Sequence, residues 1–152
     1  MSIISRLKTT ASVFTHGLPE NHRTGLGIAV AGSRYGHMLA LFRQHNPRNM
    51  IEIGVWRGDR TVHFISSGNA LKKYVGFDLF EGMNNDKYQQ ESMGHCVPHA
   101  KEMVMARIHP IAIQRGCKVE LIAGKTEETL PEFVGQNAGQ FDFIYIDGGH
   151  SL

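Results

Sequence analysis

Cysteine is scarce in this chain of 152 residues, which has two, Cys96 and Cys117. Two thiols cannot build the disulfide framework of a small secreted domain, so we expect both to be reduced in a cytoplasmic protein. Long apolar runs are also missing, because no stretch approaches the roughly 20 residues of a membrane-spanning helix. Residues 1–14 lack the apolar core and cleavage site of a secretory signal. The sequence therefore predicts a soluble protein with no membrane partner.

A strong charge of either sign is absent as well. Lysine and arginine number 16 against 14 acidic residues, and the nine histidines are scattered. A net charge of +2 does not indicate the basic surface of a nucleic-acid-binding protein. Apolar residues make up 41% of the chain, and no internal repeat divides it. At this length one domain buries about 70% of its unfolded surface, so a single globular domain is expected.

The first 32 residues lack the alternation of strand and helix patterns that follows in the rest of the chain. Apolar residues recur there at helical spacing: Ile3, Ile4, Leu7, Ala11 and Phe14. They predict a short amphipathic helix that packs on the domain. Gly25 and Gly27 are not preceded by a strand, so they do not fit a dinucleotide-binding loop. We expect residues 1–32 to form an N-terminal helix and a loop or lid segment.

From residue 33 onward, strand and helix patterns alternate. The predicted strands are "NMIEIG" (49–54), "KYVGFDLF" (73–80), "KVELIAG" (118–124) and "FDFIYID" (141–147). Helices are predicted in between, with Asp59 and Thr126 as N-caps, and with Pro110 kinking or splitting the helix after residue 100. Residues 81–99 are polar and without periodicity, which is typical of a functional or disordered loop. Strands alternating with helices predict a three-layer α/β sandwich around a parallel sheet.

The ends of the predicted strands carry glycines and acids. Ligands of such sheets bind at the carboxyl ends of the strands, where glycines allow backbone to approach a ligand closely. Gly54 and Gly58 follow the first strand, and Asp78 ends the second, where an acid can accept both hydroxyls of a ribose. The glycine spacing does not match the pyrophosphate loop of NAD enzymes, and Glu52 suits a cofactor with an amino group. These residues indicate a nucleoside-containing cofactor, whereas scattered turn residues are the alternative for each one alone.

Four motifs carry a family resemblance. "MIEIGVWRG", "YVGFDLFEG", "VELIAGKTEETLP" and "FDFIYIDGGHS", in this order, resemble the cofactor-side motifs of class I S-adenosylmethionine-dependent methyltransferases. The chain is most similar to the small-molecule O-methyltransferases that include the macrolide-sugar enzymes. This resemblance covers about residues 33–152 and implies a Rossmann-like fold with strand order 3-2-1-4. It also implies S-adenosylmethionine as cofactor and a small-molecule hydroxyl as substrate.

The resemblance assigns roles to individual residues. The implied cofactor-binding residues are Glu52, Gly54, Val55, Trp56, Gly58, Asp78, Leu79, Gly124 and Lys125. Glu52 is expected to orient the glycine loop (residues 54–58) and the ammonium of the cofactor, and Asp78 to bind the ribose. Gly124 and Lys125 are expected to flank the adenine, although Lys125 departs from the small or acidic residue common there. Trp56 and its neighbour Arg57 have surface packing as an alternative role.

"DGGH" at the end of the fourth strand resembles the Asp-x-x-His of metal-dependent sugar O-methyltransferases. The resemblance implies that Asp147 binds Mg²⁺ and that His150 is the catalytic general base. A hard cation prefers carboxylate oxygen and lowers the pKa of a bound hydroxyl, whose proton an imidazole can accept. The alternative is that Asp147 orders the loop and His150 is solvated. Cys96 and His99 have no second pair with zinc spacing, so we interpret them as structural or incidental.

The end of the sequence leads to a further expectation. In the order 3-2-1-4 the strand at 141–146 would form an exposed apolar edge, which favours association. We therefore expect residues 33–152 to be a partial cofactor-binding domain whose remaining half is C-terminal or comes from another chain or copy. On this interpretation the chain alone has little methyltransferase activity. The alternative to an enzyme is a non-catalytic nucleoside-binding or interaction module.

Overall fold

A single parallel sheet is the centre of the fold. The computed structural model describes residues 35–80 and 99–147. Its strands are β1 (Asn49–Ile53), β2 (Lys73–Asp78), β3 (Lys118–Ala123) and β4 (Phe143–Ile146), in the order β3-β2-β1-β4. The predicted parallel sheet and its strand order are confirmed. The expected helix and lid at 1–32 lie outside the described residues, as do loop residues 81–98 with Cys96.

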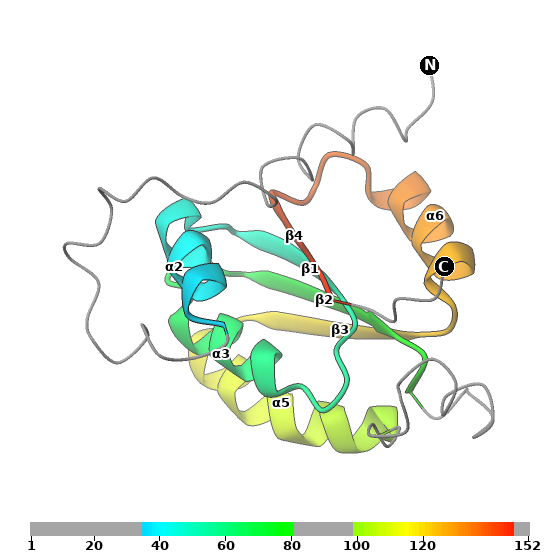
Figure 1. The fold of residues 1–152 in the computed structure, drawn as a ribbon, viewed down its shortest axis with the longest axis horizontal. Coiled ribbons are helices and arrows are strands. Elements are labelled where there is room, and N and C mark those ends of the chain that lie inside the picture. The colour runs from blue at the N-terminus through cyan, green and yellow to red at the C-terminus, as the bar shows by residue number, and fades with distance from the viewer. Residues whose placement is uncertain (1–34, 81–98, 148–152) are drawn as a thin grey trace.

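Helices cover both faces of this sheet. They are α2 (Gly36–His45), α3 (Asp59–Ser67), α5 (Lys101–Arg115) and α6 (Thr126–Asn137). Figure 1 shows α2, α3 and α5 on one side of the sheet and α6 on the other. Successive side chains of a strand point to opposite faces. Met50 therefore packs in the core below α2, α3 and α5, whereas Ile51 packs in the core below α6.

The larger of these two cores is rich in aromatic side chains. Phe42 of α2 is fully buried and contacts Phe64 of α3 and Phe143 of β4 edge to face, with ring centroids 4.8 and 5.2 Å apart. Edge-to-face pairs are a favoured geometry because the positive ring edge meets the negative ring face. In the smaller core Phe77 packs on Phe133 of α6 at 5.4 Å. Both faces of the sheet are thus fixed by aromatic contacts between a helix and a strand.

Two predicted helix caps are wrong. Asp59 is the first residue of α3, and the N-cap is Gly58 in the left-handed conformation, with φ 78°. Thr126 is likewise the first residue of α6, after Lys125 as N-cap. Neither cap makes a side-chain hydrogen bond, because glycine has no side chain and the lysine ammonium has no acceptor. Pro110 does not split α5, which continues to Arg115.

The fourth strand lies at an edge of the described sheet. β4 has four residues, and Ile146 is 65% exposed, so part of the expected apolar edge is present. Whether another chain or segment covers this edge stays a prediction. Across residues 35–80 and 99–147, none of the helices combines the length and apolar character needed to cross a membrane.

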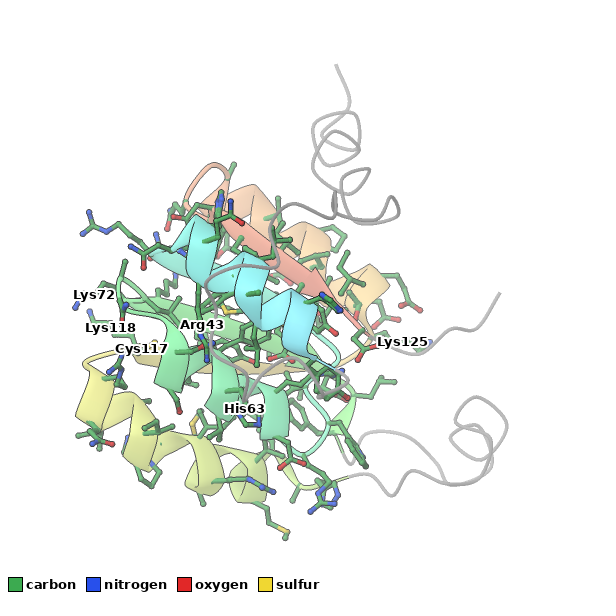
Figure 2. All side chains as sticks on the ribbon, turned by 60° about the vertical axis from the view of Figure 1, so that its left-hand side comes forward. Arg43, His63, Lys72, Cys117, Lys118 and Lys125 are labelled. Atoms are coloured by element: carbon green, nitrogen blue, oxygen red, sulfur yellow. The ribbon has the colours of Figure 1, made fainter. Side chains whose placement is uncertain are left out.

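Cys117 lies just before β3, at the opposite end of the sheet from the glycine loop. Figure 2 shows it beside Lys72 and Lys118, with Lys125 at the other end. Burial raises the pKa of the Cys117 thiol to about 11, and its side chain is 7% exposed. Thiolate, the reactive form, is then on the order of one in a thousand at pH 8.

Cys117 is therefore expected to react slowly with Ellman's reagent at pH 8 in a folded Cys96→Ser variant. Unfolding in urea should expose the thiol, return its pKa towards the ordinary value, and accelerate labelling on the order of a hundredfold. Stopped-flow absorbance measures both rates. Equal rates in the folded and unfolded chain would contradict the burial of Cys117.

Candidate functional site

The carboxyl ends of the strands meet at one edge of the sheet. Backbone hydrogen bonds join neighbouring strand ends there: Gly54 donates to Phe77 at 2.9 Å, and Asp147 donates to Ile53 at 2.8 Å. Gly124 donates to the carbonyl of Asp78 at 3.0 Å. The glycines and acids that the sequence placed at strand ends are thus brought together. This is the edge at which open α/β sheets bind their ligands.

The loop between β1 and α3 needs its glycines. Gly54 and Gly58 have φ values of 89° and 78°, a region that side chains disfavour. A Cβ on Gly58 would also come within 3.1–3.2 Å of Ile108 and Val104 of α5. The loop is therefore pressed against α5 at a point where only glycine fits without displacement. Within this loop Gly58 is buried, whereas the side chains of Trp56 and Arg57 are exposed.

Asp78 holds this loop from the neighbouring strand. Its Oδ2 accepts a 2.6 Å hydrogen bond from the backbone N–H of Trp56, and its Oδ1 accepts a 3.2 Å bond from that of Phe80. Both donors belong to bulky residues with a φ of 51°. Left-handed backbone at such residues costs energy and concentrates at functional sites. A carboxylate accepts about four hydrogen bonds, so Asp78 keeps capacity for a diol.

Glu52 occupies a fully buried position in β1. Its Oε2 accepts hydrogen bonds from Tyr74 at 2.5 Å and from Thr61 at 2.8 Å, and its Oε1 faces Nε of Arg60 at 3.3 Å. Burial raises the pKa of Glu52 above its ordinary value, although these partners oppose the shift. Burial and the Glu52 charge raise the pKa of Tyr74 well above 10, which keeps it a neutral donor. We call Glu52, Arg60, Thr61 and Tyr74 the buried network.

Arg60 links this network to the functional edge. From the first turn of α3 its Nη2 donates to the carbonyl of Gly54 at 2.6 Å, and its Nη1 forms an ion pair with Asp147. Its guanidinium lies over the rings of Tyr35 and Tyr145, 5.4 and 5.3 Å from their centroids. Burial alone would lower the pKa of Arg60, but the charge of Glu52 and the two tyrosines raise it. Arg60 is thus a charged centre between β1, the glycine loop and β4.

The predicted magnesium site does not fit these contacts. Asp147 directs its Oδ2 at the guanidinium of Arg60, whose positive charge repels a cation. Within residues 35–80 and 99–147, no three His, Cys, Asp or Glu residues are grouped as metal ligands. His150, the predicted general base, lies outside the described residues. The predicted magnesium site at Asp147 therefore finds no support in the described part of the chain.

Comparison with known proteins gives the family. A family described as "Methyltransferase domain" matches residues 51–152, which span β1 to β4 and the strand-end residues. The chain belongs to this methyltransferase-domain family. No curated protein matches it. The predicted resemblance to class I methyltransferases is confirmed.

A solved O-methyltransferase shares the fold of this methyltransferase domain. An O-methyltransferase from Bacillus cereus in complex with SAH (S-adenosylhomocysteine) is 16% identical, with a TM-score of 0.50; 95% of the chain and 52% of that protein are covered. The SAH-bound methyltransferase PaMTH1 of Podospora anserina is 22% identical, with a TM-score of 0.46; 95% of the chain and 56% of that protein are covered. The chain thus spans about half the length of these structures.

Other predicted site residues of the methyltransferase domain lie around this edge. Val55 is buried in the larger core and supports the loop from below, whereas Leu79 and Gly124 are half-buried. Lys125 is exposed and lies 3.7 Å from Glu128, one turn along α6. The ring of Trp56, 39% exposed, faces His99 edge to face at 6.2 Å. His99 therefore lies near the glycine loop. The sequence alone favours a structural or incidental role for it, but its ring contacts a residue of the candidate site.

Sequence reasoning missed Arg60, Thr61 and Tyr74. Positions 60, 61, 64 and 65 form the buried face of α3, so a charged residue at 60 stands where an apolar one is expected. A charge on the apolar face of a helix, directly after a strand with a buried acid, indicates an internal ion pair. That combination was readable in "IEIGVWRGDRT" and is the signal that could have found Arg60.

Proposed function

We propose that the chain is the S-adenosylmethionine-binding part of an enzyme that methylates a hydroxyl group of a sugar or another small molecule. The observation that carries this proposal is Asp78 at the end of β2, which accepts a hydrogen bond from the glycine loop after β1. This arrangement supports a cofactor with a ribose and a short charged end, and the family match supports methyl transfer.

The proposed roles follow from what each group offers. Asp78 accepts hydrogen bonds from the ribose hydroxyls, and the loop backbone from Gly54 to Gly58 lies against the methionine end. Leu79, Gly124 and Lys125 flank the adenine. Glu52 acts on the loop through Arg60 rather than on the ammonium directly, because it is fully buried with both oxygens engaged.

The proposed reaction is an in-line displacement in which the substrate oxygen attacks the methyl carbon and the carbon–sulfur bond breaks. The hydroxyl proton leaves to a base, for which His150 remains the candidate. The sulfonium becomes the neutral thioether of SAH. Holding donor and acceptor in line is the main contribution that a protein makes to such a step.

Asp78→Ala is expected to weaken SAH binding, measured by isothermal titration calorimetry. Losing charge-assisted hydrogen bonds to the ribose costs about 1.5–3 kcal/mol each, so the Kd should rise on the order of tenfold or more. Wild type should bind SAH in preference to NAD⁺. Asp59→Ala is the matched control, because Asp59 is a neighbouring, partly exposed acid whose ion pairs are with Arg57 and Arg107.

An unchanged Kd in Asp78→Ala would contradict the ribose assignment. Tighter binding of NAD⁺ than of SAH would contradict the proposed cofactor. SAH binding without methyl transfer to any of a panel of sugars and phenols, in a chain extended to the length of its structural neighbours, would favour the non-catalytic module.

A further inference from the structure

Arg60 contacts several functional groups of the site at once. Its three guanidinium nitrogens are distributed over Glu52, the carbonyl of Gly54 and Asp147, and its charge is enclosed by two tyrosine rings. It is 8% exposed. An arginine presents a rigid planar fork of donors, so one side chain can hold several acceptors in fixed directions. Moving any one of these acceptors would disturb the other two.

In this arrangement the carboxylate of Asp147 is already paired with Arg60. This carboxylate is the only acid at the end of β4 within the described residues, and it meets a cation that the protein itself supplies. A magnesium ion at Asp147 would have to approach the Arg60 charge or displace it. Displacement would leave the charge of fully buried Glu52 without its cation, which is costly. The guanidinium and a divalent cation therefore compete for the same carboxylate.

Building on the proposed function, we propose that Arg60 is a positioning residue that takes the place of a divalent cation at Asp147. It ties β4 to the glycine loop, and cofactor binding by this chain is independent of Mg²⁺. Glu52 of the buried network pairs with the Arg60 guanidinium, and the guanidinium donates to the Gly54 carbonyl. The buried network therefore sets the position of this loop carbonyl. The acid of β1 and the acid of β4 thus act on the cofactor loop through one arginine.

Two calorimetric titrations of wild type test the metal half of this proposal. MgCl₂ titrated alone into the chain at millimolar concentration is expected to give no saturable heat. SAH titrated with magnesium or with EDTA is expected to give the same Kd, within about a factor of two. Saturable magnesium binding that Asp147→Asn abolishes, or SAH binding that requires magnesium, would overturn the proposal.

Variants of Arg60 test the positioning half. Arg60→Met is expected to raise the Kd for SAH by about tenfold or more, since a thioether cannot hold the Gly54 carbonyl or Asp147. Arg60→Lys should recover part of the affinity, because its single ammonium restores the charge but not the fork. Arg43→Met is the matched control, since Arg43 is exposed in the last turn of α2.

A magnesium response separates positioning from mere loss of stability. Removing Arg60 uncovers two carboxylates, so Arg60→Met is expected to acquire magnesium binding at Asp147 that wild type lacks, and Arg60→Met/Asp147→Asn to lose it again. Wild-type affinity for SAH in Arg60→Met, or the absence of magnesium binding in folded Arg60→Met, would overturn the proposal. If wild type binds no SAH, the proposed function fails, while the magnesium titrations still decide the role of Arg60 at Asp147.

Discussion

Glu52→Ala is expected to lower the free energy of unfolding by about 3–5 kcal/mol, measured by urea denaturation. The substitution removes a fully buried carboxylate, so buried Arg60 loses one of its two anionic partners. Tyr74 and Thr61 lose their shared acceptor at the same time. A buried donor without an acceptor adds a penalty of about 1–3 kcal/mol. The variant also leaves a cavity at the centre of the sheet.

Two milder variants separate these contributions. Glu52→Gln keeps the shape and an acceptor oxygen but removes the charge, so its loss of stability should be smaller than that of Glu52→Ala. Tyr74→Phe removes one donor and leaves the ion pair with Arg60, with an expected loss of about 1–3 kcal/mol. If Glu52→Ala were as stable as wild type, the buried network would not hold the fold together.

The buried network explains why a core strand carries an acid. Burial raises the pKa of Glu52, so its ionised form is unfavourable by itself and depends on the groups around it. Those groups come from α3 and β2, and through Arg60 they reach the Gly54 carbonyl 2.6 Å away. The acid therefore connects the hydrophobic core with the shape of the cofactor loop.

Hydrophobic patterning was sufficient to predict a parallel α/β sandwich, whereas the strand order followed from the family resemblance. Nearly continuous apolar runs such as "MIEI", interrupted only by Glu52, and "YVGF" are typical of parallel strands covered on both faces, and here they lie in β1 and β2. Strand-end glycines and acids were predictable because parallel strands bring their carboxyl ends to one edge. Asp78 and Gly54 are the clearest examples. Their functional roles still depend on the binding experiments.

The cap residues and the partners of the acids were not predictable in the same way. Local preference favoured Asp59 as an N-cap, but the left-handed turn at Gly58 starts α3 one residue earlier in the chain. The pairing of Arg60 with Asp147 joins residues far apart in sequence and depends on β4 lying beside β1. The Asp-x-x-His motif indicates a metal ligand at Asp147, but it contains no information about Arg60 of α3, which pairs with the same carboxylate. Tertiary contacts therefore decide the chemistry of Asp147.

Phe42→Ala is expected to destabilise the chain by about 3–5 kcal/mol, because the side chain is fully buried and the cavity cannot collapse easily. Phe42 is in contact with the rings of Phe64 and Phe143, so it connects α2 to α3 and to β4. Since Asp147 directly follows β4, loosening this cluster should disturb the end of the strand that Arg60 holds. The loss of stability is measured by urea denaturation, and the effect on the site by SAH titration.

Met103→Ala is the matched control for this cavity, because Met103 lies in α5 with 65% of its surface exposed. Its expected effect is within about 0.5 kcal/mol, as for other surface substitutions. Phe42→Leu should fall between the two, since it retains part of the buried volume but no ring edge. If Phe42→Ala cost no more than Met103→Ala, the aromatic cluster would not anchor β4. A stability loss with unchanged SAH affinity would show that Arg60 and the glycine loop keep their arrangement independently of the cluster.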